Sequence, residues 1–257
     1  MSRDALEGRS IVVTGAASGQ GLREAILLAQ AGARVIALDA APEAPRELDG
    51  PDIAYATLDV TDESAWADLA ARLRSELDGS PLHGLVNNAG VTHRATIAAT
   101  EVSAWDRVLA VNLTGPMLGM RALAPLMGEG LSIVNIGSVA ALTGHYTAAY
   151  TASKWGLRGL THAAATEYGG RGIRVNVIHP GFIDTPMTAN APDAMRSAQL
   201  LLTPLKRVGA PDEVAGLVVF LMTDAAAYIT GAEIPVDGGY TLSGSATFMA
   251  DRIAEMR

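Results

Sequence analysis

The stretch "VVTGAASGQGLREAILLAQAGA" (12–33) decides the fold class of this 257-residue chain. A β-branched apolar run leads into a glycine-rich turn, and a helical pattern follows the turn directly. Gly15, Gly19 and Gly21 allow a sharp turn and a close approach of the backbone to a ligand, because glycine has no Cβ. The helix that begins near Gln20 would direct its free N–H groups at a pyrophosphate. We therefore expect a strand, a phosphate-binding turn and a helix.

The spacing of this turn is G-x-x-x-G-x-G. It is not the G-x-G-x-x-G of many dinucleotide-binding proteins, and no lysine follows it as in a P-loop. The next expected strand ends at Asp39, 24 residues after Gly15. A carboxylate in that place accepts hydrogen bonds from both hydroxyls of an adenosine ribose and repels a 2′-phosphate. No Arg or Lys stands at 16–20 or 40–41, so we expect NAD rather than NADP as the cofactor.

Short β-branched runs alternate with longer helical patterns along the chain. This alternation predicts a doubly wound α/β fold, in which helices cover both faces of a parallel sheet of about seven strands. No linker or repeat divides residues 1–257, so we expect one catalytic domain, and a longer interruption at about 182–210 is expected to form a substrate loop. The expected strands are 10–15, 34–39, 53–59, 82–90, 132–137, 173–181 and 232–239, and the expected helices are 20–31, 62–77, 101–127, 149–168 and 211–223.

Composition and charge exclude several classes of protein. The net charge of −8 and the absence of a Lys/Arg run argue against a nucleic-acid partner. The chain has no cysteine, which excludes disulfides, thiol nucleophiles and Cys-ligated zinc, and we expect no metal site. The polar start lacks a secretory signal, and "VAGLVVFLM" (214–222) is far shorter than the ~20 residues of a membrane helix. We expect a cytoplasmic protein.

Tyr150 and Lys154 stand four residues apart in "AAYTASKWGL" (148–157). On a helix, such a pair lies one above the other. A free tyrosine has a pKa of ~10 and needs a shift of roughly three units to accept a proton near neutrality. An ammonium ~4 Å away, at an effective dielectric of ~20, supplies about 4 kcal/mol, which is a shift of that size. We therefore expect Lys154 to make Tyr150 an acid/base catalyst.

Two further polar residues are candidates for the same site. Ser138 follows the fifth expected strand in "VNIGSVAAL" (134–142). Ligands of parallel α/β sheets bind beyond the carboxyl ends of the strands, where the Ser138 hydroxyl is placed to polarise a carbonyl. Asn112 shares a helical face with Trp105, Val108 and Leu109, a pattern that on its own also fits a buried asparagine satisfied by the backbone.

Six ordered motifs together resemble the short-chain dehydrogenase/reductase family, from about residue 9 to about residue 240. The resemblance implies a Rossmann-type fold, hydride transfer to or from a nicotinamide, and a homo-oligomer, with a homotetramer favoured over a dimer. The motifs are "TGAASGQG" (14–21), "NNAG" (87–90), "VNLTG" (111–115), Ser138 with "YTASK" (150–154), "HPGFIDTPM" (179–187) and "ITGAEIPVDGG" (229–239).

The resemblance also assigns roles by position. It implies that Ser138 orients the substrate oxygen, that Tyr150 exchanges its proton, and that Lys154 lowers the tyrosine pKa and holds the nicotinamide ribose. Asn112 matches the asparagine that organises a water chain to the lysine. The residues implied to contact the cofactor, besides Tyr150 and Lys154, are Gly15, Ser18, Gly19, Gln20, Gly21, Asp39, Asp59, Val60, Asn88, Pro180, Gly181, Ile183 and Thr185.

Substrate choice is expected to lie in 91–94, 144–148 and 182–205. Candidate substrate contacts are Ser138, His145, Tyr146, Phe182 and Met187, which give a mostly apolar lining. His93, Arg94 and His145 are candidates for a polar contact, but each is expected to be a solvated loop residue, and no cationic cluster indicates a carboxylate. The 179–188 segment and the closing segment are also similar to bacterial hydroxysteroid dehydrogenases, which favours a bulky apolar secondary alcohol or ketone.

Three alternative functions stay open. A 3-oxoacyl carrier-protein reductase would prefer NADPH and a basic docking patch, and Asp39 and the acidic balance argue against both. A non-catalytic dinucleotide-binding regulator would be indicated by loss of Tyr150 or Lys154, and both are present. A methyltransferase that binds S-adenosylmethionine at the glycine turn is disfavoured by the tyrosine–lysine pair.

Overall fold

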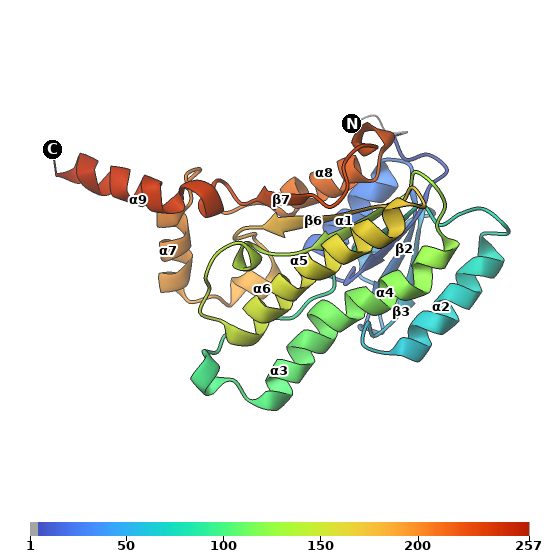
Figure 1. Cartoon of the computed structure of the whole chain (residues 1–257), viewed down its shortest axis with the longest axis horizontal. Coiled ribbons are helices and arrows are strands. Elements are labelled where there is room, and N and C mark those ends of the chain that lie inside the picture. The colour runs from blue at the N-terminus through green and yellow to red at the C-terminus, as the bar shows by residue number, and fades with distance from the viewer. Residues whose placement is uncertain (1–4, 257) are drawn as a thin grey trace.

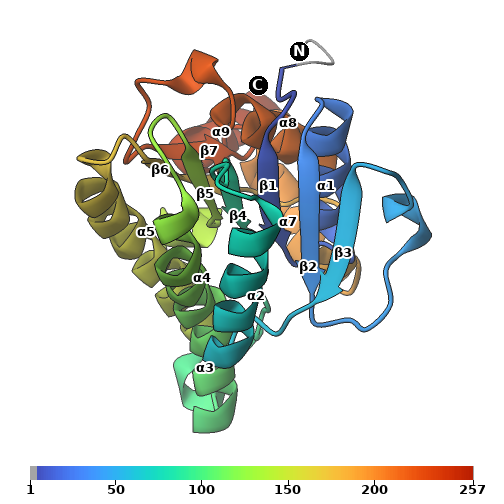
Figure 2. The same ribbon diagram turned by 90° about the vertical axis from the view of Figure 1, so that its right-hand side faces the viewer.

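The computed structural model describes residues 5–256, and its centre is one parallel sheet. The sheet has seven strands in the order β3-β2-β1-β4-β5-β6-β7 (Figure 2), as the alternation of patterns predicts. The first strand, β1, lies in the middle of the sheet, and the order of the strands reverses between β1 and β4. A crevice forms at this point, at the carboxyl ends of the strands. The strands are β1 Ser10–Thr14, β2 Arg34–Asp39, β3 Ile53–Thr57, β4 Gly84–Asn87, β5 Ser132–Ile136, β6 Arg174–Pro180 and β7 Glu233–Val236.

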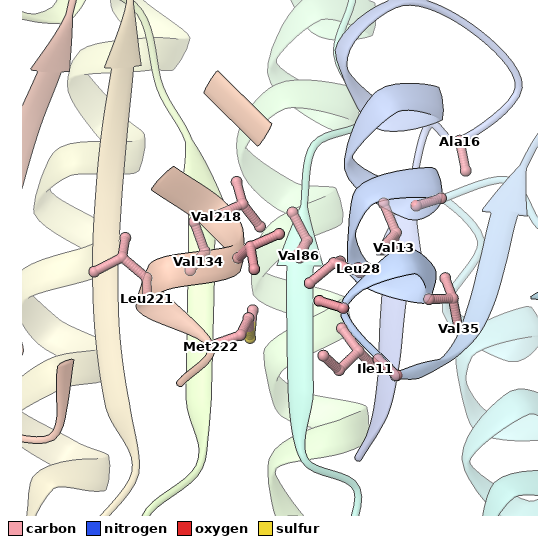
Figure 3. Packing of buried hydrophobic residues seen from close by; sticks show 14 of the residues in the cluster. Ile11, Val13, Ala16, Leu28, Val35, Val86, Val134, Val218, Leu221 and Met222 are labelled. Carbon is pink, nitrogen blue, oxygen red and sulfur yellow. The ribbon is translucent and has the colours of Figure 1, made fainter. Parts of the chain in front are cut away.

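Successive side chains of the central strands pack into two separate apolar layers. In β1, Ile11 and Val13 join the layer drawn in Figure 3, whereas Val12 joins the layer on the opposite face. Strands buried on both faces need continuous apolar runs rather than alternation, which is the pattern of the sequence. Helices α1 (Gly19–Gln30) and α8 (Pro211–Leu221) cover the first face, and α2 (Glu63–Glu76), α4 (Gly115–Leu123) and α5 (Ala148–Gly169) cover the other (Figure 2).

The helix expected over 101–127 is not continuous. It consists of α3 (Val102–Leu109), a π-helical turn (Ala110–Thr114), α4 and a 3₁₀ turn (Ala124–Leu126). A π-helical turn inserts an extra residue into the helix and is typical of functional sites. Here the wider turn contains Asn112, whose side chain makes the contacts described below.

The substrate loop (182–210) contains two helices, α6 (Pro186–Ala189) and α7 (Asp193–Leu202). The chain ends in a further helix, α9 (Tyr240–Glu255), which extends away from the sheet and crosses α7 (Figure 1). Gly244 brings α9 close to α7, since a Cβ there would lie 2.7 Å from the carbonyl oxygen of Leu202. Lys206 and Asp251 form an ion pair of 2.5 Å beside this contact.

The sequence patterns gave no expectation for α9. One face of this helix carries Leu242, Met249 and Ile253, which are exposed. These residues form an apolar stripe of the kind that usually packs against a core, but here they face away from the close contact that α9 makes with α7 at Gly244. Over residues 5–256, no helix combines the length and apolar character needed to cross a membrane.

Candidate active site

The glycine turn between β1 and α1 is held by the side chain of Asn88. Its amide nitrogen donates hydrogen bonds to the carbonyl oxygens of Thr14 and Gly15, over 2.9 and 3.1 Å. Gly15 has a φ of 67°, and a Cβ there would lie 2.8 Å from Cα of Ala89. A Cβ on Gly21 would lie 2.2 Å from the carbonyl oxygen of Gly15. The turn therefore depends on backbone contacts that only glycine permits.

The start of α1 combines free backbone donors with polar side chains. Ser18 is the N-cap residue, and its hydroxyl makes no capping bond. The Oε1 atom of Gln20 is buried and has no hydrogen-bond partner among residues 5–256. Thr185 lies against the turn, since a Cβ on Gly19 would lie 3.5 Å from Cβ of Thr185. Unpaired N–H groups at a helix N-terminus with hydroxyls around them are suited to a pyrophosphate.

Asp39 ends β2 and lines a cavity of about 430 Å³. Its carboxylate accepts hydrogen bonds from the backbone nitrogens of Ala17 and Ala41, over 2.9 and 3.0 Å. The cavity opens where the sequence predicts the adenosine of the cofactor. The lining residues are Gly15, Asp39, Ala40, Leu58, Asp59, Val60, Thr61, Ala89, Gly90, Val91, Arg107, Ala110 and Val111.

Asp59 and Val60 lie in this cavity, as the family motif implies. The Asp59 carboxylate accepts hydrogen bonds from the nitrogen and the hydroxyl of Thr61, over 2.9 and 2.8 Å. The carbonyl oxygen of Val60 accepts a 3.0 Å bond from the buried indole of Trp66. Arg107, on α3, also lines this cavity. It was not predicted, because it is distant in the sequence from both the glycine turn and Asp39.

Ser138 and Lys154 are fixed at the end of β5. The Ser138 hydroxyl oxygen accepts a 3.1 Å bond from the nitrogen of Ala140, which leaves the hydroxyl hydrogen free to donate. The ammonium of Lys154 donates a 2.7 Å bond to the carbonyl oxygen of Ile136 and is 4% exposed. Tyr150 lies on the same helix as Lys154 and lines the same pocket as Ser138. The structure thus brings the three expected catalytic residues together.

Burial shifts the pKa values of both Tyr150 and Lys154. Burial raises the pKa of Tyr150, and interaction with the Ser138 hydroxyl and the charge of Arg94 only partly oppose this rise. The Lys154 nitrogen lies 5.8 Å from the centre of the Tyr150 ring, and burial lowers the pKa of this lysine to about 8. Burial disfavours the charged form of both groups. The lowering of the tyrosine pKa by Lys154 stays a prediction for the site with its coenzyme bound.

Asn112 connects the cofactor side of the site to the catalytic helix. Its Oδ1 accepts a 2.8 Å bond from the nitrogen of Val91, and its Nδ2 donates to the carbonyl oxygen of Val91 over 2.9 Å. The same Nδ2 donates to the hydroxyl of Ser153 over 3.1 Å, and that hydroxyl donates to the carbonyl oxygen of Tyr150 over 2.7 Å. Asn112 is fully buried, so these bonds fix the 88–91 segment against α5.

Gly90 shows that the cofactor cavity and the catalytic residues adjoin. It lines the cavity that contains Asp39. A Cβ on Gly90 would lie 3.4 Å from Oδ1 of Asn112 and 3.7 Å from the ammonium nitrogen of Lys154. The lysine therefore lies at the inner end of the predicted cofactor site.

The segment after β6 is held by the last strand. The nitrogen of Gly181 donates a 3.0 Å bond to the carbonyl oxygen of Val236. A Cβ on Gly181 would lie 2.8 Å from Cα of Asp237. Pro180 and Ile183 on either side are buried. The segment therefore has a fixed path from β6 to Thr185 at the glycine turn.

A small pocket of about 90 Å³ opens above Ser138 and Tyr150, between the 92–94 segment and the substrate loop. His145, Phe182 and Met187 line it, as expected. Tyr146 lies outside the lining: its ring stacks on His145 with centroids 4.8 Å apart, and the residue is 51% exposed. The lining residues are Thr92, Arg94, Ser138, Val139, Ala140, His145, Thr147, Tyr150, Gly181, Phe182, Met187, Thr188, Met195 and Gln199.

Arg94 is the main departure from the expected apolar lining. Arg94 is exposed, as expected of a solvated loop residue, but it also lines this pocket and donates a 2.8 Å hydrogen bond to the carbonyl oxygen of Met187. The sequence carried no signal for this position, because the direction of a loop side chain depends on the distant segment that it contacts. His145 also lines the pocket. Burial lowers its pKa, and its Nδ1 lies 2.8 Å from the hydroxyl of Thr147.

His179 supports Ser138 from behind and was not singled out in the sequence. The ring is fully buried, and its Nδ1 lies 3.0 Å from the carbonyl oxygen of Ser138. A Cβ on Gly137 would lie 2.6 Å from that nitrogen, so the small residue before Ser138 makes room for the ring. No three His, Asp or Glu side chains within residues 5–256 are grouped so that they could hold a metal ion.

Known proteins match this chain over nearly its whole length. A family model described as enoyl-(acyl carrier protein) reductase matches residues 15–241. The trans-4-hydroxycyclohexanecarboxylate dehydrogenase of Sinomonas cyclohexanicum is 38% identical over 257 residues, which cover 94% of this chain and 96% of that protein. The chain belongs to the short-chain dehydrogenase/reductase family. Family membership establishes an oxidoreductase that acts on an alcohol or a ketone.

Other relatives in this family differ in substrate at similar identity. A 3-alpha-(or 20-beta)-hydroxysteroid dehydrogenase of Mycobacterium tuberculosis is 41% identical over 248 residues, 94% of this chain and 92% of that protein. A 3-oxoacyl-[acyl-carrier-protein] reductase of Thermotoga maritima is 38% identical over 247 residues, 92% of this chain and 99% of that protein. A solved structure of a proposed NAD(P)-dependent gluconate 5-dehydrogenase from Beutenbergia cavernae, with NADP at low occupancy, is 35% identical, with a TM-score of 0.86 over 93% of this chain and 99% of that chain.

Proposed function

We propose that this protein is an NAD-dependent dehydrogenase that interconverts a secondary alcohol and its ketone, with Tyr150 as the acid/base. The observation that carries the proposal is the meeting of Ser138, Tyr150 and Lys154 at the end of β5, next to a cavity that begins at the glycine turn and contains Asp39. When bound, the nicotinamide supplies or accepts the hydride. The protein then has to bind the oxygen of the substrate and move one proton.

The catalytic residues divide this work. Ser138 donates its hydroxyl hydrogen to the substrate oxygen, because the N–H of Ala140 occupies one lone pair of the hydroxyl oxygen and leaves this hydrogen available. Tyr150 gives its proton to that oxygen during reduction and takes it back during oxidation. Lys154 donates one hydrogen bond to the carbonyl oxygen of Ile136. Its remaining N–H donors are available to a ribose hydroxyl, and its positive charge is available to stabilise the phenolate. The hydrogen bonds of Asn112 to Val91 and Ser153 hold the cofactor side of the site in a fixed position against the catalytic helix.

The residues fit a dinucleotide. A Cβ at Gly15 or Gly21 would collide with backbone, so the turn leaves a bare surface for a pyrophosphate. Asp39 and Asp59 place carboxylates in the cavity expected to hold the adenosine. A carboxylate at the end of β2 favours the two ribose hydroxyls of NAD and repels the phosphate of NADP. Arg107 lines the same cavity and is the one cation among its described lining residues. It is therefore the one group there that would favour the phosphate of NADP.

We propose a cyclic or bulky apolar substrate, such as a hydroxysteroid. Phe182, Met187 and Met195 supply apolar walls, and relatives at about 40% identity act by name on hydroxysteroids or hydroxycyclohexanecarboxylates. A 3-oxoacyl carrier-protein reductase is the second candidate, supported by the Thermotoga maritima relative. A homotetramer, expected from the family resemblance, belongs to the proposal and is tested by light scattering on the purified protein.

Coenzyme titration followed by a substrate panel tests this proposal. Isothermal titration with NAD, NADP and S-adenosylmethionine should show the tightest binding for NAD. Cyclic alcohols and their ketones are then screened for a change in the absorbance band of NADH, beside a 3-oxoacyl thioester. Binding of NADP alone, or turnover of the thioester alone, would favour the carrier-protein reductase and overturn the first candidate.

A further inference from the structure

We propose that Arg94 binds a carboxylate of the substrate, so that the preferred substrates are hydroxy acids and oxo acids whose carboxylate lies several bonds from the reacting carbon. This inference rests on the proposed function and narrows the substrate class of the same pocket. It assigns Arg94 as a specificity-determining residue that contacts the substrate at the end remote from Tyr150.

The charge balance of the pocket is the first argument. Its lining contains hydroxyl, amide and apolar side chains, one histidine and one arginine, and no aspartate or glutamate. Burial lowers the pKa of His145, which disfavours its charged form. Arg94 is therefore the single formal charge among the lining residues that the structure describes. A pocket with one unbalanced cation favours an anionic group on its ligand.

The hydrogen-bonding state of Arg94 is the second argument. One terminal nitrogen donates to the carbonyl oxygen of Met187, which orients the guanidinium. Within residues 5–256, no carboxylate lies close enough to Arg94 to form a salt bridge. By contrast, two other arginines each donate two hydrogen bonds to one carboxylate: Arg23 to Asp212 and Arg207 to Glu213. Arg94 retains further N–H donors in the planar fork that binds a carboxylate in two places.

The relation of Arg94 to the reacting group is the third argument. Arg94 and Tyr150 line one pocket, and the charge of Arg94 lowers the tyrosine pKa. A ligand that spans the pocket can therefore place its hydroxyl on Tyr150 and Ser138 and its carboxylate on Arg94. Because Arg94 also holds the carbonyl of Met187, such a ligand would contact the substrate loop and the 92–94 segment together.

Matched substrates provide the test. Wild-type protein is assayed with 3- and 4-hydroxycyclohexanecarboxylate and with the corresponding uncharged methyl esters. A hydrogen-bonded ion pair with Arg94 should favour each acid over its ester in kcat/KM by about 10- to 100-fold. Arg94→Gln should bring this acid-to-ester ratio close to one, mainly through KM of the acids, and Arg94→Lys should restore part of it because the point charge remains. Arg196→Gln, which removes an exposed arginine of α7 outside the pocket lining, is the matched control.

A binding experiment separates failure of this inference from failure of the proposed function. Isothermal titration of the coenzyme-loaded protein with cyclohexanecarboxylate and with its carboxamide requires no turnover. Binding of the acid should weaken about 10-fold or more in Arg94→Gln, even if none of the alcohols is oxidised. Equal affinity of wild type and Arg94→Gln for the acid, or an acid-to-ester ratio that the substitution leaves unchanged, would show that Arg94 only ties the substrate loop and would overturn the inference.

Discussion

The ammonium of Lys154 donates a 2.7 Å hydrogen bond to the carbonyl oxygen of Ile136, the last residue of β5. Ser138 follows two residues later, and Tyr150 lies one turn before Lys154 on α5. This single bond therefore joins the helix that carries the proton-transfer residue to the strand end that carries the substrate-orienting residue.

Replacement of Tyr150 by phenylalanine should abolish most of the turnover while it leaves coenzyme binding intact. The ring and its packing remain, but no group is left to exchange a proton with the substrate oxygen. General acid/base catalysis contributes about 100- to 10,000-fold, so kcat should fall by at least about 100-fold. Steady-state kinetics and NAD titration measure the two effects, and a variant that keeps a tenth of its activity would contradict the role of Tyr150.

Replacement of Lys154 by methionine should lower both turnover and coenzyme affinity. The variant loses the bond to Ile136 and the donors available to the nicotinamide ribose, so NAD affinity should fall about 10-fold, together with kcat. The contrast with Tyr150→Phe is the informative result, since only the lysine is assigned two roles. Unchanged NAD affinity in Lys154→Met would show that the lysine does not contact the coenzyme.

Loss of the Asp39 carboxylate should relax the preference for NAD over NADP. The ratio of kcat/KM for the two coenzymes should fall about 10-fold or more in Asp39→Ala, because ribose hydrogen bonds are lost and the repulsion of a 2′-phosphate disappears. Asp39→Asn is the matched control, since its amide oxygen can still accept from Ala17 or Ala41. It separates loss of charge from loosening of the loop. An unaltered coenzyme ratio in both variants would rule out Asp39 as the selector.

Replacement of Asn112 by alanine should lower both stability and activity. The substitution removes one buried and two part-buried hydrogen bonds and leaves the N–H and C=O of Val91 without their partner. Each unsatisfied buried group costs about 1–3 kcal/mol, so the free energy of unfolding should fall by about 2–4 kcal/mol in urea titration. Ser153→Ala removes only the branch towards Tyr150 and should have a smaller effect. Equal losses in the two variants would contradict the bridging role of Asn112.

A buried carboxyl on α1 should make the stability of the protein depend on pH. Glu24 is fully buried, neither oxygen has a hydrogen-bond partner among the described residues, and burial raises its pKa from 4.5 to about 8. Between these values the folded chain binds a proton that the unfolded chain releases. Stability therefore falls as pH rises through this range, by at most about 5 kcal/mol.

Glu24→Gln should remove this dependence on pH. The melting temperatures of variant and wild type should be similar at about pH 5, where the carboxyl is largely protonated when folded, and the variant should gain an advantage towards about pH 9. Thermal unfolding followed by circular dichroism at both pH values measures the difference. A constant difference between the two proteins would mean that Glu24 does not titrate in this range.

Most of the sheet could be predicted because its strands are buried on both faces. The centres of runs such as 10–14 and 34–39 are continuously apolar, and Gly15 or Asp39 marks their ends. The π-helical turn at Asn112 could not be predicted, because "AVNLT" contains no residue that breaks a helix. Its widening follows from contacts with Val91 and Ser153, which are distant in the sequence.

The candidate site, like the fold, could be predicted only in part. Ser138 and Asp39 lie at strand ends, which the topology of a parallel sheet brings together. Tyr150 and Lys154 could be placed from their four-residue spacing on one helix. The directions of Arg94 and Tyr146 depend on how the substrate loop packs, and the raised pKa of Tyr150 depends on burial, so neither follows from spacing.

The substrate loop and Arg94 contribute walls to the pocket, whereas Tyr150 and Lys154 lie on α5 and Ser138 follows β5. Most of the pocket walls and the proton-transfer residues therefore belong to separate pieces of the chain. Evolution, or a protein engineer, could exchange residues 186–202 for the corresponding segment of a relative and obtain a new substrate range. The reaction centre would be inherited unchanged by such a chimera.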